Sequence, residues 1–168
     1  MTDTELCMVD TNILVYMFEG SYEAKHELAY ELLEDVMENR INAAVSTQIL
    51  SELFVNLTAE KKRTVVTSPL DVTSAEVIIK DIAKTAHFTF FDVKPANVLG
   101  AIQLKKSYGI SYWDCLIAAT MKENSITKIY TEDKEFEKIS GITVINPFPS
   151  RQQSTGLSRN SDLGAKTI

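Results

Sequence analysis

The sequence contains no long hydrophobic run, and its start is not basic. None of its apolar stretches reaches the roughly 18 residues that a membrane-spanning helix needs. Residues 1–5 are polar and acidic, whereas a secretory signal begins with a basic segment that leads into an apolar one. We therefore expect a cytoplasmic protein with no membrane partner.

Cysteine and histidine are both scarce, with two residues of each. Cys7 and Cys115 lie inside apolar runs, which predicts buried thiols that an intracellular protein keeps reduced. His26 and His87 belong to no HExxH or Cys/His pattern, so the usual kinds of zinc site are excluded. We expect them to be ordinary surface or boundary residues. The sequence also offers no plausible Ser–His or Cys–His pair, which leaves water as the nucleophile of any hydrolysis.

A basic surplus is missing as well. The chain carries 17 Lys and Arg against 23 Asp and Glu, a net charge of −6. Proteins that bind nucleic acid usually show the opposite balance, so any phosphate contact must be local. The small basic groups, at 61–63, 105–106, Arg151 and Arg159, are each more typical of a solvated surface than of a binding patch. A divalent cation held by clustered carboxylates would, however, neutralise an acidic site locally.

What the sequence does contain is enough apolar residue, 45% of 168 positions, to build the core of one domain. After Pro149 the composition shifts to Arg, Gln, Ser, Gly and Asn, and the apolar periodicity ends. We therefore predict a domain over residues 1–149 and a flexible C-terminal tail over residues 150–168.

Strand-like and helix-like segments alternate along this domain. Expected strands are 6–9, 41–45, 88–93, 128–130 and 142–145. Expected helices are 13–18, 22–40, 48–57, 74–83, 95–108, 112–121 and 133–139, with 61–69 irregular. This alternation predicts an α/β fold, a three-layer α/β/α sandwich around a central, mostly parallel sheet of four to five strands.

Acidic residues occupy the positions where such a fold binds its ligands, beyond the carboxyl ends of the strands. Asp10 follows the first expected strand and Asp133 follows the strand at 128–130. Asp114 falls in the first turn of a helix, and Glu52 about two turns into another. Carboxylate oxygens are the ligands that Mg²⁺ and Mn²⁺ prefer, and carboxylates brought together repel unless a cation or proton intervenes. A converging set would therefore require a metal.

Each acid also has a purely structural interpretation. Asp10 could help to cap the helix that follows it, and Asp133 could be the N-cap of the next one. Ser111 and Asp114 have the spacing of a capping box. Glu52 lies away from the apolar stripe of its helix, which favours an ordinary solvated side chain. No single position decides between the two interpretations.

Five short motifs, taken together, are more specific. They are V-D-T-N at 9–12, S-E at 51–52, Y-W-D-C-L-I-A-A at 112–119, Y-T-E-D at 130–133 and V-I-N-P-F at 144–148. In this order they resemble the PIN-domain family, and within it the VapC-type toxins. The resemblance spans residues 6–148; it is dense at the five motifs and sparse between them.

The resemblance implies roles for individual residues. By position, the family's acidic quartet, which binds the metal and carries the catalysis, falls on Asp10, Glu52, Asp114 and Asp133. The polar residues expected to support these ligands from behind are Asn12 and Thr131. Glu132 is a minor candidate, because it should point away from its neighbour Asp133. Trp113, within the third motif, is more typical of packing at the edge of the core than of a base-stacking platform.

The resemblance also implies an activity. It predicts a metal-dependent endoribonuclease, with Mg²⁺ or alternatively Mn²⁺, in which metal-activated water hydrolyses RNA phosphodiester bonds. The expected products carry 5′-phosphate and 3′-hydroxyl ends, and the expected substrate is a structured RNA such as transfer or ribosomal RNA. It further predicts the toxin of a toxin–antitoxin pair, a homodimer silenced by a small antitoxin protein.

Three alternatives remain open at this point. A phosphatase of the haloacid-dehalogenase type also begins with Asp after the first strand, but it needs D-x-D where this chain has Asn12 in the third position. A non-catalytic PIN-type module would bind RNA or a protein without cleaving. An RNA-maturation nuclease of the same fold would share the chemistry but not the toxicity.

Overall fold

A computed structural model describes residues 3–18, 22–59 and 68–148. The predicted tail at 150–168, the basic group at 61–63 and Ser21, expected to cap the second helix, lie outside the described residues. The division into a domain over 1–149 and a tail therefore stays a prediction.

The centre of the molecule is one five-stranded sheet, as predicted. All neighbouring strands are parallel, in the order β3-β2-β1-β4-β5. The strands are β1 (Asp3–Val9), β2 (Ile41–Ser46), β3 (Phe88–Phe91), β4 (Lys128–Tyr130) and β5 (Thr143–Ile145). In the middle strand β1, Cys7, Met8 and Val9 are at most 1% exposed, because helices cover the sheet on both faces. Cys7 and Cys115 are buried, free thiols, as expected.

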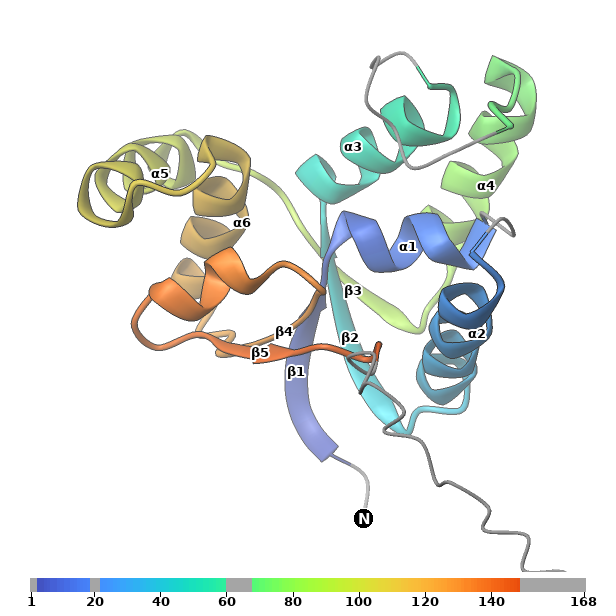
Figure 1. Ribbon diagram of the computed structural model, residues 1–168, viewed down its shortest axis with the longest axis horizontal. Coiled ribbons are helices and arrows are strands. Elements are labelled where there is room, and N and C mark those ends of the chain that lie inside the picture. The colour runs from blue at the N-terminus through green and yellow to red at the C-terminus, as the bar shows by residue number, and fades with distance from the viewer. Residues whose placement is uncertain (1–2, 19–21, 60–67, 149–168) are drawn as a thin grey trace, which may run out of the picture.

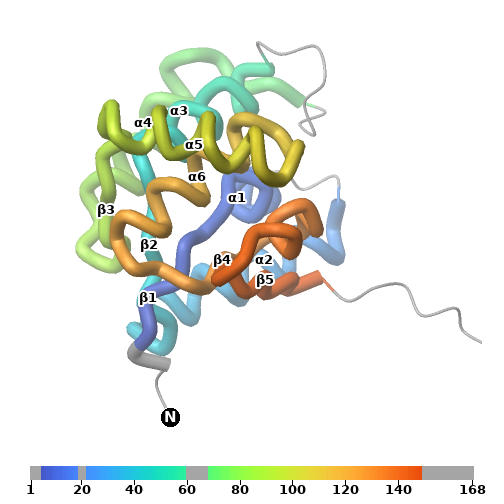
Figure 2. The backbone as a smooth tube through the Cα atoms, turned by 90° about the vertical axis from the view of Figure 1, so that its left-hand side faces the viewer, coloured from blue at the N-terminus to red at the C-terminus, as the bar shows by residue number. Residues whose placement is uncertain are grey.

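The helices form the outer layers of a three-layer α/β/α sandwich. Figure 1 shows α1 and α2 on one side of the sheet and α5 and α6 on the other, and Figure 2 views the molecule from the α5 and α6 side, with these helices in front of the sheet. The helices are α1 (Thr11–Phe18), α2 (Glu23–Met37), α3 (Thr47–Leu57), α4 (Val72–Lys84), α5 (Pro95–Tyr108), α6 (Tyr112–Glu123) and the 3₁₀ helix η1 (Lys134–Lys138). Within the described ranges, no helix has both the length and the apolar character to cross a membrane.

Local sequence explains where several of these helices begin and end. Ser46 caps α3 by accepting a hydrogen bond from the Ile49 N–H. Pro95 occupies the first turn of α5, and Gly109 ends it in the left-handed conformation (φ 71°). Asp71 caps α4, so this helix begins at Val72, two residues before the predicted start at 74.

Two helices differ from their predicted form. The second ends at Met37 instead of about 40, because Asn39 adopts a left-handed conformation (φ 56°) that an α-helix cannot continue through. The segment after Asp133 is a short 3₁₀ helix rather than an α-helix. Five residues are too few for the longer hydrogen-bonded pattern to be preferred over the tighter turn.

Strand register brings the chain segments beyond β1 and β4 together. Val9 pairs with Tyr130 across the sheet, so both strands end at the same level. The ladder continues past them, since the Asp10 N–H donates to the Tyr130 carbonyl at 3.0 Å and the Thr131 N–H donates to the Ile145 carbonyl at 3.1 Å. Residues that follow these strands are therefore held side by side at one edge of the sheet.

The helix that carries Asp114 is anchored by a buried apolar face. Ile117 of α6 is 1% exposed, while Leu99 of α5 is 66% exposed. We expect Ile117→Ala to lower the free energy of unfolding by about 2–5 kcal/mol, because it leaves a cavity in the core. Leu99→Ala, the control, should change it by no more than about 0.5 kcal/mol. Urea unfolding followed by circular dichroism measures both; equal losses would contradict the packing described here.

Candidate active site

A cavity of about 200 Å³ lies where β1 ends and α1 begins. Its lining residues are Asp10, Thr11, Asn12, Val15, Glu52, Asn56, Asp114 and Asp133. All four acids that the sequence suggested as metal ligands are among them, although they come from four separate parts of the chain. The expected convergence is therefore present in the geometry, while the catalytic and metal-binding roles of these residues stay a prediction.

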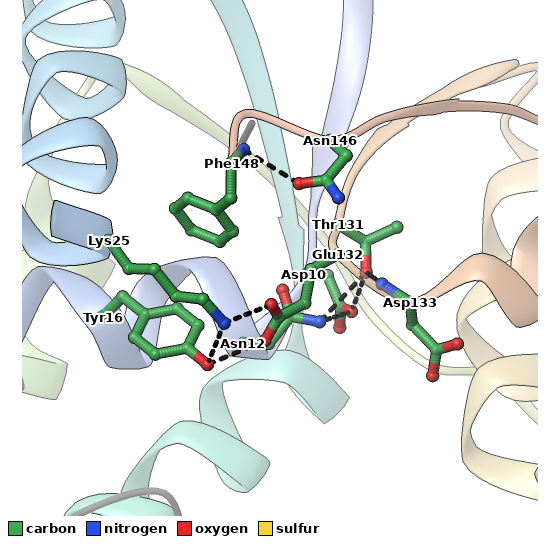
Figure 3. Close-up of polar contacts among 9 residues, drawn as sticks. All are labelled: Asp10, Asn12, Tyr16, Lys25, Thr131, Glu132, Asp133, Asn146 and Phe148. Atoms are coloured by element: carbon green, nitrogen blue, oxygen red, sulfur yellow. Dashed lines mark hydrogen bonds and ion pairs between the residues drawn. The ribbon is translucent and has the colours of Figure 1, made fainter. Parts of the chain in front are cut away.

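Asp10 is held more firmly than the other acids. It is 7% exposed, and three donors fix its carboxylate: the Thr11 N–H (2.7 Å), the Asn12 amide (2.8 Å) and the Thr131 hydroxyl (2.6 Å). Figure 3 draws the contacts with Asn12 and Thr131, which both donate to the same oxygen, Oδ2. The main-chain carbonyl of Asp10 also accepts from the Ile13 N–H at the start of α1. Asp10 therefore stands directly before α1 and lines the cavity as well.

Thr131 connects two of the acids. Its hydroxyl donates to Asp10 and accepts from both the Asn12 amide and the Asp133 N–H, each at 3.0 Å. The Thr131 side chain is completely buried and fixes the spacing of these side chains from the protein interior. It stands at the supporting position that the resemblance implied. Asp133 in turn accepts from the Glu135 N–H at 2.8 Å, so it caps η1 as well as lining the cavity.

Glu52 is not the ordinary solvated side chain that its helical position favoured. It is partly buried, and its carboxylate accepts from the Thr11 hydroxyl at 3.2 Å and from the Gln48 amide at 2.9 Å. The helical wheel of α3 could not reveal this, because Thr11 belongs to α1. Sequence reasoning also missed Gln48 and Asn56, one turn before and one turn after Glu52; the spacing of four was the available signal.

Asp114 does not complete the predicted capping box. The Ser111 hydroxyl accepts from the Trp113 N–H at 3.2 Å, and the described residues show no bond from Asp114 back to the Ser111 N–H. Among those residues, its carboxylate accepts no hydrogen bond at all. Both of its oxygens are therefore available to a ligand in the cavity.

Burial and repulsion from neighbouring carboxylates make Asp10 and Asp114 reluctant to ionise. Burial raises the pKa of Asp10 to about 6, and the nearby charges of Glu52 and Asp133 add to the effect, although hydrogen bonds from Thr131 and Thr11 oppose it. Burial likewise raises the pKa of Asp114 to about 7, helped by the charges of Asp133, Asp10 and Glu52. A cation in the cavity would remove this penalty.

Glu132 points away from the cavity, as expected, and joins a separate cluster drawn in Figure 3. Its carboxylate accepts from the Tyr16 hydroxyl at 2.7 Å and from the Lys25 ammonium at 2.5 Å. The ammonium also lies over the rings of Tyr16 (4.5 Å) and Phe148 (5.3 Å). This cluster ties α1 and α2 to the turn that carries Thr131 and Asp133. Neither Tyr16 nor Lys25 carries a sequence signal that would have revealed this contact.

The cavity suits a hydrated divalent cation better than a closed metal cage. Within the part of the chain that the structure describes, no three acidic, cysteine or histidine side chains are arranged to hold one ion directly. Mg²⁺ usually keeps several waters and binds through one or two carboxylates. Since a water molecule takes up about 30 Å³ in the liquid, a cavity of about 200 Å³ has room for an ion and part of its hydration shell. The hard oxygen donors around it fit Mg²⁺ or Mn²⁺.

Comparison with known proteins agrees with the geometry. The PIN domain family model matches residues 7–142, which include all four acids. The chain belongs to the PIN domain family. This assignment excludes the haloacid-dehalogenase alternative, which the Asn12 position had already weakened. No curated protein sequence matches this PIN-domain chain.

Several solved structures have a fold similar to that of this PIN domain. One is VapC20 from Mycobacterium tuberculosis, described as a toxin that cleaves the sarcin-ricin loop, with a TM-score of 0.62 and 17% identity over 79% of this chain and 93% of that one. VapBC2 from Rickettsia felis, bound to a promoter DNA fragment, has a TM-score of 0.59 and 21% identity over 84% of this chain and 98% of that one. A toxin–antitoxin complex from Klebsiella pneumoniae has a TM-score of 0.57 and 20% identity over 84% of this chain and 98% of that one. At these identities the likeness establishes the fold.

The raised carboxylate pKa values predict how the metal-free protein responds to pH. Both values lie above the roughly 3.9 of an unfolded chain, so the folded state binds more protons between about pH 4 and pH 7. Its free energy of unfolding should therefore fall as pH rises through this window. We expect Asp114→Asn in EDTA to exceed wild type by about 1–3 kcal/mol near pH 8, and by little near pH 4.

Urea unfolding at several pH values measures this difference. Asp81→Asn on the exposed face of α4 makes the same change in charge outside the cavity, and serves as the control. An Asp114→Asn advantage that does not depend on pH would show that the carboxylate is not strained by burial and like charge.

Proposed function

We propose that this PIN-domain protein is a divalent-metal-dependent endoribonuclease that uses Mg²⁺ or Mn²⁺. One observation carries the proposal: four carboxylates from distant parts of the chain share one small cavity, where two of them resist ionisation. Membership of the PIN family supports a nuclease at the level of the family. A plain binding module would have no need to bring so much like charge together.

In this proposal the acids bind the cation, and the polar residues in contact with them fix their orientation. Asp10, Asp114 and Asp133, together with Glu52, would hold the cation, in part through its water molecules. When bound, the ion lowers the pKa of a water molecule to make a nucleophile and stabilises charge on the leaving oxygen. Asn12 and Thr131 fix the orientation of Asp10, and Thr11 and Gln48 fix that of Glu52.

Substrate and partner follow from the relatives, as further parts of the proposal. VapC20 is described as cleaving the sarcin-ricin loop, an RNA element, which supports a structured RNA such as ribosomal or transfer RNA for this chain. Other relatives in fold were solved as toxin–antitoxin complexes, which supports a small antitoxin partner. We further propose a cytoplasmic homodimer and cleavage that leaves 5′-phosphate and 3′-hydroxyl ends.

Mutation of the acids tests the enzyme directly. We expect Asp10→Asn and Asp114→Asn to reduce cleavage of ribosomal and transfer RNA on the order of 100-fold or more, because each removes a charge that the cation needs. EDTA should abolish wild-type cleavage, and Mg²⁺ or Mn²⁺ should restore it. Gel analysis of the RNA ends measures all of these. Asp81→Asn is the control and should cleave as wild type does.

The same variants address the non-catalytic alternative. A pure RNA- or protein-binding module would show no metal-dependent cleavage in the wild type, and its effects in cells would survive Asp114→Asn. If the wild type cleaves RNA but both acid variants cleave equally well, the assignment of the site is wrong although the activity stands.

Expression separates a toxin from an RNA-maturation nuclease of the same fold. We expect the wild-type chain to arrest growth and Asp114→Asn not to do so. Co-expression of a small reading frame encoded immediately upstream should relieve the arrest. Growth unaffected by active wild-type enzyme would favour the maturation nuclease, since the chemistry would then be present without toxicity.

A further inference from the structure

A second cavity adjoins the acidic one. Its volume is about 440 Å³, within the range of small-ligand pockets. The residues that line it are Thr47, Gln48, Ser51, Glu52, Val55, Val93, Trp113 and Leu116. Glu52 lines both cavities, so they lie next to each other.

Trp113 forms one wall of this second cavity and precedes Asp114 in the first turn of α6. It is 52% exposed, as packing at the edge of the core allows, so about half of its surface is open to a ligand. The ring of Tyr112 contacts it edge to face, with centroids 5.6 Å apart, and so orients the indole. Helix α6 therefore places an aromatic surface beside a carboxylate of the candidate active site.

Gln48 adds a hydrogen-bonding group to the same cavity. It is 7% exposed, and its amide nitrogen donates to the Glu52 carboxylate and to the Trp113 carbonyl, both at 2.9 Å. Reversing the amide would turn its oxygen toward two acceptors, so the orientation is fixed. The oxygen Oε1 is buried and has no donor among the described residues. A ligand that brings an N–H group would satisfy it once the neighbouring side chains shift to expose the oxygen.

Charge explains why such a cavity would matter to an RNA substrate. The chain has a net charge of −6, and the ammonium of Lys25 is paired with Glu132, so the electrostatic attraction that RNA-binding proteins usually have for phosphate is missing from the chain as a whole. Uncharged contacts can supply affinity instead, and stacking on an aromatic ring is available to every base. We propose that this cavity binds a nucleobase next to the cleaved bond, stacked on Trp113, with an N–H of its edge donating to Gln48. The inference rests on the proposed function, because it assumes an RNA substrate.

Fluorescence tests the binding without any cleavage. Trp113 is the sole tryptophan of the chain, so intrinsic emission reports on this cavity. In MgCl₂, we expect AMP, CMP and GMP to quench the wild-type emission saturably, whereas ribose 5-phosphate, with the same phosphate and no base, leaves it unchanged. Purine riboside 5′-phosphate, which lacks the amino group of AMP, should bind roughly 2- to 10-fold more weakly, the loss of one neutral hydrogen bond.

Three fluorescence results would overturn the inference. Equal quenching by ribose 5-phosphate would show that the base is not recognised. Absence of saturable quenching would show that the cavity takes no base. Emission that changes with protein concentration, with no response to nucleotides, would show that the cavity is covered by a second copy of the chain.

Cleavage kinetics link the cavity to the proposed activity. We expect Trp113→Leu to raise KM for RNA by roughly 5- to 150-fold, the range of base–aromatic stacking, with kcat within about 3-fold of wild type. Trp113→Phe, which keeps an aromatic face, should restore most of the affinity. An unchanged KM in Trp113→Leu would contradict the inference while leaving the nuclease intact. Quenching by nucleotides in a protein that cleaves no RNA would contradict the proposed function while leaving the base-binding cavity intact.

Discussion

Repulsion between carboxylates is the constraint around which this molecule is built. Four acids line one cavity, although like charges repel one another: Asp10 directly follows β1, Glu52 lies on α3, Asp114 on α6 and Asp133 in the turn after β4. Hydrogen bonds from Thr11, Asn12 and Thr131 compensate Asp10, while Asp114 has no such support among the described residues. The fold thus holds the acids in place without enough positive charge to balance them. A divalent cation with its water molecules would supply that charge.

The parallel sheet makes this convergence possible. Because β1 and β4 pair in register and end together, the residues after them meet without any further bend of the chain. Helices α3 and α6 then bring Glu52 and Asp114 in from either side of that edge. On the far side of Thr131, the contact of Glu132 with Tyr16 and Lys25 joins the turn to the helical layer. These contacts belong to both the fold and the site, so a mutation that disturbs the packing of these elements also moves the residues of the site.

Sequence predicted the elements that depend on local chemistry and missed what depends on contacts between elements. Five strands, the Ser46 cap and the Pro95–Gly109 boundaries follow from short patterns of residue type. The partly buried state of Glu52 does not, because its partner Thr11 lies 41 positions away. The early end of α2 depends on the left-handed conformation of a single residue, Asn39. The half-exposed state of Trp113 depends on how much of its side chain the neighbouring helix α3 covers. Ordered motifs identified the acids together, although each acid alone was ambiguous.

The central claim is that the acidic cavity binds a divalent cation, and anomalous diffraction from crystals soaked in MnCl₂ tests it most directly. The account predicts a manganese peak inside the cavity, between the carboxylates of Asp10 and Asp114, that excess MgCl₂ displaces and that Asp10→Asn abolishes. A cavity without manganese at saturating concentration, in crystals where the four carboxylates keep the arrangement described here, would contradict it.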